Sequence, residues 1–222
     1  MSADHGKQFT IYMHAGGPNP WKVIIVFEEL GLTYHMIFVD TSKQEHRLAS
    51  YTDKNPNGRL PTIIDHKNND FTIWESGAIL MYLVGKYDKE HKISFSGFDT
   101  IATANQYLMF QMSGQGPYFG QAIWFTKYHA EKIPSAIARY DAEIRRVLGV
   151  LEVILADKEY LVEDRVSYVD LAFVPWNWLL KWLPNSADWE KDFPKVAEWD
   201  GRLNARESVK KAREIRADAL KA

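Results

Sequence analysis

The chain has 222 residues, of which 46% are hydrophobic and 25% charged, and its formal net charge is −2. This balance is typical of a globular protein with a sizeable core, and without a basic excess it argues against nucleic acid or an anionic membrane as a partner. The chain contains no cysteine, which excludes disulfides, thiolate metal sites and a thiol nucleophile of the protein's own.

The first third of the chain alternates between strand and helix patterns. Runs rich in β-branched and aromatic residues predict strands at 9–13, 34–39, 62–65 and 71–74. Between the first two strands, apolar residues at helical spacing predict a helix that stops at Gly31. The same spacing predicts another helix after Ser76. This order predicts one mixed sheet with helices packed against it.

Beyond a polar stretch at 88–97 the pattern becomes helical, and no further strand is expected. Ser167 and Asp170 have the S-x-x-D spacing of a capping box and are expected to open a buried helix. We therefore predict an α/β domain at residues 1–88 and an all-helical domain at residues 97–222.

Two further features concern a possible helix break and the location of the protein. Gly116 and Pro117 are expected to break or kink their helix, because proline removes a hydrogen-bond donor and clashes with the preceding turn. No apolar run approaches the ~18 residues of a membrane helix. The polar segment MSADHGKQ has no apolar signal core. A cytoplasmic location is therefore expected.

Asn19 follows a glycine and proline turn, in HAGGPNPWKV, at the start of the first predicted helix. One interpretation is structural, with Asn19 as the N-cap and Pro20 at the first helical position. The other is functional, because a helix N-terminus carries partial positive charge and free N–H groups that stabilise an anion, and the amide can donate one more hydrogen bond. The residues alone favour the cap.

The segments NPNGRLP, WESGAILMYL and SYVDLAFVPW occur in this order on the expected elements. Together with the predicted architecture, they make essentially the whole chain resemble the cytosolic glutathione transferases. The segments GPNPWKV, EHR, IWESGAIL and VDLAFVPWN are most similar to the fungal branch related to the nitrogen-catabolite regulator that can become a prion. The resemblance implies a thioredoxin-like N-terminal domain, an all-helical C-terminal domain, glutathione as co-substrate and a homodimer.

Most members of the family offer Tyr, Ser or Cys near the first turn. Here the candidate positions hold His14, Ala15, Gly16 and Gly17, none with a hydroxyl or thiol. The resemblance therefore implies that Asn19 is the partner of the glutathione thiolate, as in asparagine-type members, with His14 a weaker competitor. Lowering a thiol pKa by about two units needs about 2.7 kcal/mol, which a helix end and one or two donors can supply.

The resemblance also implies the remaining glutathione contacts. Glu75 and Ser76 match the ammonium and carboxylate of the γ-glutamyl group, and Leu60, before an expected cis Pro61, pairs its backbone with the cysteinyl part. His46 lies where the branch contacts the glycyl carboxylate. Each has a structural alternative: a helix N-cap for Ser76, a dipole-complementing acid for Glu75, a trans proline at a strand entry, and a surface histidine.

A second substrate is expected to be less polar than glutathione. Tyr118, Phe119 and Trp124 form an aromatic group near the expected kink, and such a wall suits a planar electrophile. Aromatic residues at helical spacing are also typical of a core, and this alternative stays open. The histidines show no ligand pairing, so no metal site is expected.

Two hypotheses for function follow. The first is an enzyme that activates glutathione for conjugation to electrophiles, for glutathione-dependent disulfide or peroxide reduction, or for both, with a role in detoxification. The second is a non-catalytic protein on the same fold that binds glutathione or aromatic ligands, or regulates. The Asn/Gln-rich prion segment of the regulator has no counterpart in this sequence, which favours the enzyme. The ligand is expected to be glutathione or glutathione disulfide.

Overall fold

The computed structural model describes residues 5–183 and 188–221. These residues form two compact units. The first combines the described residues up to Ser94 with those from Glu207 onward, and the second is Phe95–Arg206. The predicted domains, 1–88 and 97–222, differ from this division at the C-terminal end, where the last helix joins the first unit.

The first unit contains a four-stranded mixed sheet in the order β2-β1-β3-β4. Its strands are β1 (Phe9–Met13), β2 (Tyr34–Phe38), β3 (Thr62–Asp65) and β4 (Phe71–Trp74). β1 pairs in parallel with β2 and antiparallel with β3, so that Ile11 lies opposite Met36 on one side and Ile63 on the other. β4 pairs antiparallel with β3. The four expected strands and the mixed sheet are confirmed.

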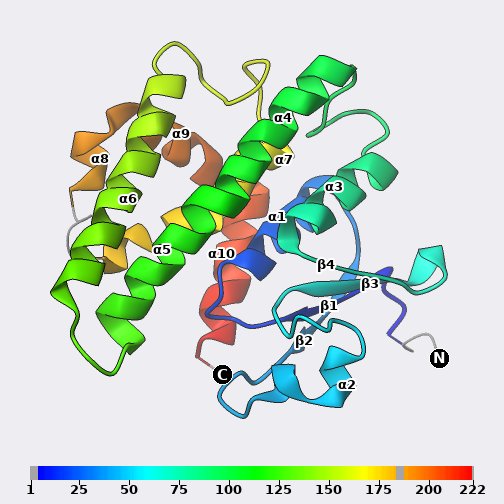
Figure 1. The fold of residues 1–222 in the computed structure, drawn as a ribbon. Helices are drawn as coiled ribbons and strands as arrows, with labels where there is room; N and C mark the ends of the chain where they lie inside the picture. The colour runs from blue at the N-terminus through cyan, green and yellow to red at the C-terminus, as the bar shows by residue number, and fades with distance from the viewer. Residues whose placement is uncertain (1–4, 184–187, 222) are drawn as a thin grey trace. The chain divides into compact units, whose positions relative to one another are not determined.

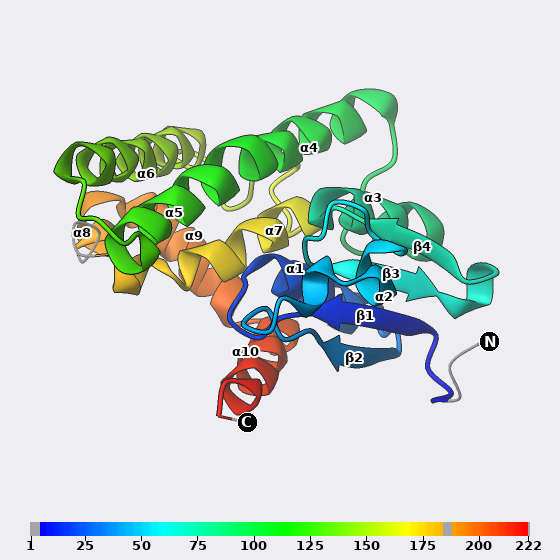
Figure 2. The same ribbon diagram turned by 60° about the horizontal axis from the view of Figure 1, so that its bottom comes forward.

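Helices cover both faces of this sheet: α1 (Asn19–Leu30), α2 (Ala49–Thr52) and α3 (Ser76–Tyr87). Successive side chains of a strand point to opposite faces. The ring of Phe9 contacts Phe27 of α1 and Tyr87 of α3, at 4.8 and 5.5 Å between ring centroids. The ring of Tyr12 instead contacts Tyr51 of α2 at 5.8 Å. α1 and α3 therefore share one face and α2 lies on the other, as Figure 1 and Figure 2 show.

The helix α10 (Glu207–Ala219) packs against α1. The hydroxyl of Ser208 donates to Oε1 of Glu29 at 2.5 Å, and Nζ of Lys211 donates to Oε2 of Glu28 at 2.7 Å. These contacts join residues about 180 positions apart, which helical periodicity in the sequence cannot reveal. They explain why the last helix belongs to the first unit.

The second unit is helical. It consists of α4 (Phe98–Phe110), α5 (Gly116–Ile123), α6 (Pro134–Ile154), α7 (Tyr168–Asn177), α8 (Trp189–Asp192) and α9 (Pro194–Asn204). No strand occurs at its described positions, 95–183 and 188–206. Across the part of the chain that the structure describes, no helix combines the length and apolar character needed to span a bilayer.

Pro117 does not break the helix in which it lies. α4 continues into α5 through a π-helical turn, Gln111–Gln115, and Gly116 keeps right-handed helical dihedral angles of −56° and −57°. A π turn holds an extra residue, which accommodates the missing donor and the bulk of a proline that follows it. Figure 1 shows α4 and α5 as successive segments of one rod. Of the two predicted alternatives, the break does not occur and the kink stays a prediction, while the local irregularity is this π turn.

Candidate active site

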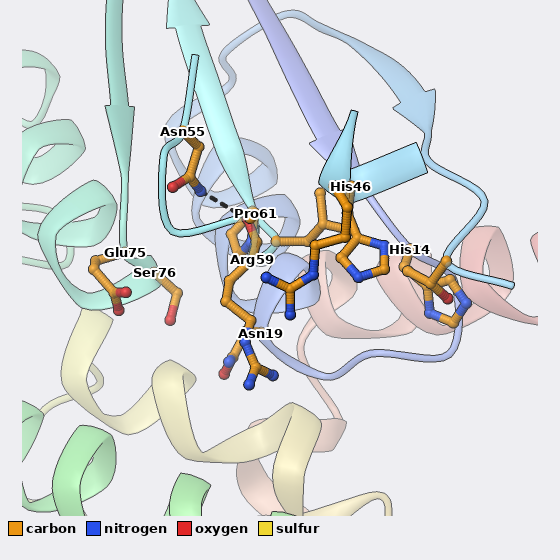
Figure 3. Close-up of a pocket in the computed structure, with 12 residues that line it drawn as sticks. His14, Asn19, His46, Asn55, Arg59, Pro61, Glu75 and Ser76 are labelled. Atoms are coloured by element: carbon orange, nitrogen blue, oxygen red, sulfur yellow. Dashed lines mark hydrogen bonds between the residues drawn. The ribbon is translucent and has the colours of Figure 1, made fainter. Parts of the chain in front are cut away.

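The first unit contains a cavity of about 450 Å³. Figure 3 shows the side chains around it. It is lined by His14, Asn19, Thr41, His46, Arg47, Asn55, Gly58, Arg59, Leu60, Pro61, Glu75 and Ser76. All six residues predicted to hold or activate glutathione are in this set, although they come from four separate stretches of the chain.

Asn19 is the first residue of α1, and its half-buried side chain lines the cavity. Pro18 occupies the N-cap position and Pro20 is the second helical residue, so the predicted capping arrangement is shifted by one residue. The first N–H groups of a helix have no intrahelical partner and carry partial positive charge. The amide of Asn19 and the positive end of α1 therefore meet the same part of the cavity.

The turn before α1 is held by its own side chains. Nδ1 of His14 accepts hydrogen bonds from the N–H groups of Gly16 and Gly17, both at 3.1 Å. A Cβ atom on Gly16 would lie 2.8 Å from Cε1 of His14, so this close approach requires glycine. Nε1 of Trp21 donates to the carbonyl of Ala15 at 3.0 Å. His14 is thus tied into the turn, and Asn19 is placed by a rigid backbone.

The NPNGRLP segment lines the cavity between the start of α1 and the start of α3. The buried amide of Asn55 donates to the carbonyl of Arg59 at 2.7 Å and to the hydroxyl of Thr62 at 3.0 Å. The hydroxyl of Tyr51 adds a hydrogen bond to the same carbonyl at 2.5 Å. The Leu60–Pro61 peptide bond is cis, which confirms the expectation for Pro61.

Glu75 and Ser76 lie where β4 turns into α3. Ser76 is the first helical residue, and its side chain is 2% exposed. Glu75 has a φ of 69° and a ψ of 112°, a region that costs a non-glycine residue about 1–3 kcal/mol. Nδ2 of Asn57 donates to Oε1 of Glu75 at 3.4 Å. The strained backbone of Glu75 therefore places an exposed carboxylate beside the start of α3.

Lys22 lies behind Ser76 and was missed by the sequence analysis. Its side chain is 1% exposed, and Nζ donates to Oγ of Ser76 at 3.3 Å. Burial lowers the pKa of Lys22 to about 7, and the negative charge of Glu75 acts in the opposite direction. In the sequence it is an ordinary polar position of a helix, so no local signal marks it as buried.

The other end of the cavity is rich in basic groups. Nδ1 of His46 is buried and has no hydrogen-bond partner among the described residues. Burial lowers the pKa of His46, and so do the positive charges of Arg47 and Arg59 and, to a smaller extent, His14. Arg59 also lines the cavity. In Figure 3, Glu75 and Ser76 lie on one side, His46 and His14 on the other, and Asn19 between them.

This order of charges defines the kind of ligand that fits. The side with Glu75 and Ser76 offers a carboxylate for an ammonium group and a helix N-terminus for a carboxylate. The side with His46 and two arginines suits a second carboxylate. Between them, the start of α1 and Asn19 suit a third group that carries negative charge.

The aromatic residues expected to contact a second substrate all belong to the second unit. Tyr118 is half-buried, with the guanidinium of Arg146 lying 5.8 Å from its ring centroid. Trp124 is 50% exposed, whereas Phe119 has no exposed surface. Tyr118 and Trp124 keep the accessible faces that a ligand needs, while Phe119 has the burial of a core residue. The assignment of these three residues stays a prediction.

Family models match both parts of the chain. The N-terminal domain of glutathione S-transferase matches residues 7–85, and the C-terminal domain matches residues 117–207. Glutathione S-transferase 2 of Schizosaccharomyces pombe is 51% identical over 214 residues, which are 91% of this chain and 93% of that protein. The chain belongs to the glutathione S-transferase family. The resemblance stated from the motifs is confirmed, together with the thioredoxin-like and all-helical parts of the fold.

Solved structures agree with this assignment along nearly the whole chain. The glutathione transferase URE2P6 from Phanerochaete chrysosporium, in complex with oxidized glutathione, has a TM-score of 0.95 and 53% identity, covering 98% of this chain and 100% of that one. Ure2p5 from the same organism, cocrystallized with 1-(S-glutathionyl)-2,4-dinitrobenzene, has a TM-score of 0.90 and 45% identity, covering 98% of both chains. The fungal, Ure2-type branch is therefore also confirmed.

Proposed function

We propose that this glutathione S-transferase binds glutathione along the cavity, with the γ-glutamyl group at Glu75 and Ser76, the sulfur at Asn19 and the glycyl carboxylate at His46. Glutathione carries an ammonium group and a carboxylate at one end, a thiol in the middle and a carboxylate at the other end. The observation that carries the proposal is the matching order of charges around the cavity.

Asn19 and the start of α1 stabilise the thiolate over the thiol. The amide donates a hydrogen bond to sulfur, and the helix end adds partial positive charge. Stabilising the anion lowers the pKa of the bound thiol, so more of it is ionised at neutral pH. The thiolate then attacks an electrophilic carbon, a carbon–sulfur bond forms, and the leaving group departs with its electron pair.

The first prediction concerns Asn19→Ala, assayed with 1-chloro-2,4-dinitrobenzene, whose reaction releases chloride and yields the conjugate bound to Ure2p5. Removing one donor to a developing or stabilised anion costs about 1.5–3 kcal/mol, so we expect kcat to fall about 10- to 150-fold. The affinity for glutathione, measured by calorimetry, should change by less than about threefold, because both ends of the ligand keep their contacts.

The pH profile of the same variant distinguishes thiol activation from a structural effect. We expect the pH at which kcat reaches half its maximum to move upward in Asn19→Ala, because the bound thiol then keeps a pKa nearer its ordinary value. An unchanged kcat and an unchanged profile would remove Asn19 from the mechanism. Asn69→Ala is the matched control, because it removes the same amide from an exposed position that does not line the cavity.

Disulfide reduction is a second activity of the same site. It is supported by the oxidized glutathione bound to URE2P6, whose chain is 53% identical to this one. The thiolate of bound glutathione attacks the glutathionyl sulfur of a mixed disulfide, forming glutathione disulfide and releasing the other partner as a thiolate that takes up a proton. No cysteine of the protein is needed for this exchange. Reduction of peroxides by glutathione belongs to the same proposal.

A homodimer is also part of the proposal. α4 exposes three apolar side chains on one face, with Phe98 85%, Ile101 41% and Met109 48% exposed. A stripe of this kind on a globular unit is typical of a surface that another chain covers. The family resemblance supports a second copy of this chain as that partner. A cytoplasmic location and a role in detoxification complete the proposal.

A further inference from the structure

Lys22 is a buried charge that the proposed chemistry does not use. It lies three residues after Asn19, so the two side chains share one face of α1, with Lys22 one turn deeper. Its side chain is 1% exposed and contacts a residue 54 positions away in the chain. A buried lysine is costly to the folded state unless its charge has a counterpart. Nζ of Lys22 donates a hydrogen bond to Ser76, and the negative charge of Glu75 acts on it.

We propose that Lys22 is a positioning residue for the α-carboxylate of the γ-glutamyl group, acting through Ser76. This inference rests on the proposed function. A lysine ammonium has three donors and no acceptor, so Oγ of Ser76 accepts the hydrogen bond from Nζ. A hydroxyl that accepts a hydrogen bond still has its own hydrogen to donate to an acceptor. In the complex that acceptor is the ligand carboxylate in the cavity that Ser76 lines.

The charge of Lys22 has a second effect. Glu75 presents a negative charge at the same end of the cavity, which attracts the ligand ammonium but repels the ligand carboxylate. Lys22 provides a positive charge behind Ser76 that compensates this repulsion, and the low polarity of a buried position strengthens its field. Lys22 and Glu75 together thus match both charges of an amino-acid head group. Neither Glu75 alone nor Ser76 alone does so.

The test compares one protein change with one ligand change. The protein change is Lys22→Met, and the ligand change replaces the γ-glutamyl group by 4-aminobutyryl, giving 4-aminobutyryl-cysteinyl-glycine, which lacks only the α-carboxylate. Calorimetry on the full-length protein should show glutathione binding weakened about tenfold or more by Lys22→Met. Binding of the analogue should change by less than about twofold, since the group that Lys22 serves is absent.

Ser76→Ala and the double variant test whether Lys22 acts on the ligand through Ser76. If Lys22 acts through the hydroxyl, the loss in the double variant is smaller than the product of the two single losses. Lys89→Met is the matched control, because Lys89 is exposed on the surface and its replacement removes the same charge away from the cavity. It should leave both affinities unchanged.

A measurement on the unmodified protein covers the case in which Lys22→Met fails to fold. S-methylglutathione, which has no thiol proton, is titrated near pH 8 in two buffers with different ionisation enthalpies. Because the pKa of Lys22 is about 7 in the free protein and a bound carboxylate raises it, we expect net proton uptake. The charged group that acts on Lys22 is Glu75, which lies at the same end of the cavity.

The outcomes separate the two proposals. If the unmodified protein binds neither glutathione nor S-methylglutathione, the proposed function fails. If it binds them without proton uptake, or if Lys22→Met weakens glutathione and the analogue equally or weakens neither, the role of Lys22 is overturned while the proposed function stands. Selective loss toward glutathione supports the assignment.

Discussion

At the scale of single residues, the cavity combines groups that favour ligand binding over stability. Glu75 keeps a backbone conformation unfavourable for its residue type, and Lys22 keeps a charge in the protein interior. Strained and buried polar residues concentrate at functional sites, because the surrounding structure supports what the ligand requires. Both residues contact or act on Ser76, so the cost is concentrated at the γ-glutamyl end of the site.

This cost leads to a prediction about stability and pH. The pKa of Lys22 falls from its ordinary 10.5 to about 7 in the folded protein, with burial as the main cause. Between these values the unfolded chain binds the proton more strongly, so the contribution of Lys22 to the free energy of unfolding rises as pH increases from about 7 to about 10.5. Lys22→Met removes this contribution.

The increase in free energy of unfolding that Lys22→Met shows over the unmodified protein should therefore be largest near pH 7 or below. It should shrink by at least about 1 kcal/mol by pH 9. Urea titrations at equal protein concentration measure it, because effects of all other groups cancel in the difference. A difference that stays constant with pH would mean that Lys22 titrates normally in the folded state.

At the scale of elements, the start of α7 in the second unit is held by a capping box. The buried carboxylate of Asp170 accepts hydrogen bonds from the N–H of Ser167 at 2.9 Å and from that of Leu161 at 3.0 Å. Nε1 of Trp199 in α9 adds another at 3.0 Å. The capping box predicted from Ser167 and Asp170 is confirmed. The contacts with Leu161 and Trp199 extend it into a connection between a loop, α7 and α9.

Asp170→Ala should destabilise the protein by about 3–5 kcal/mol, because it leaves several buried donors without an acceptor. Urea unfolding measures the loss. Asp157→Ala, at an exposed loop position, is the control and should change stability by less than about 0.5 kcal/mol. Wild-type stability in Asp170→Ala would show that other acceptors replace the carboxylate. The glutathione affinity of the folded fraction should be retained, because Asp170 belongs to the helical unit and not to the cavity.

At the scale of the whole molecule, the two ends of the described chain contribute to the same unit. The last helix returns to the first unit through Ser208 and Lys211, so the N-terminal unit is built from both ends of the chain. An isolated fragment ending near residue 94 would leave the α10-facing side of α1 uncovered. Binding experiments therefore require the complete chain.

Assembly gives the final prediction. Replacing Ile101 and Met109 by glutamate places two charges on the exposed apolar face of α4, and we expect the homodimer to dissociate at micromolar concentration, since burying unpaired charges in an interface is costly. Light scattering coupled to gel filtration measures the mass. Val153→Glu is the control, because Val153 is 77% exposed on α6. A dimer that persists in the double variant would place the interface elsewhere.

Local sequence patterns were sufficient to predict most helices and strands of this protein and the types of residue at its site. The four strands, the helix stop at Gly31 and the capping box depend on local periodicity and turn chemistry, which neighbouring residues set among themselves. The six predicted glutathione residues follow from local motifs and the family resemblance. For Asn19, the local pattern favoured a cap over an anion site, although both require the same helix end.

Which of these groups lie next to each other depends on how the chain folds in three dimensions. It brings the starts of α1 and α3 to one cavity, adds Arg59, buries Lys22 against Ser76, and places α10 on α1. It also carries the helix through Pro117 by a π turn. The physical reason is that burial, pKa and cavity shape depend on contacts between distant segments, such as the 54 positions that separate Lys22 from Ser76. No local pattern of residues specifies such contacts.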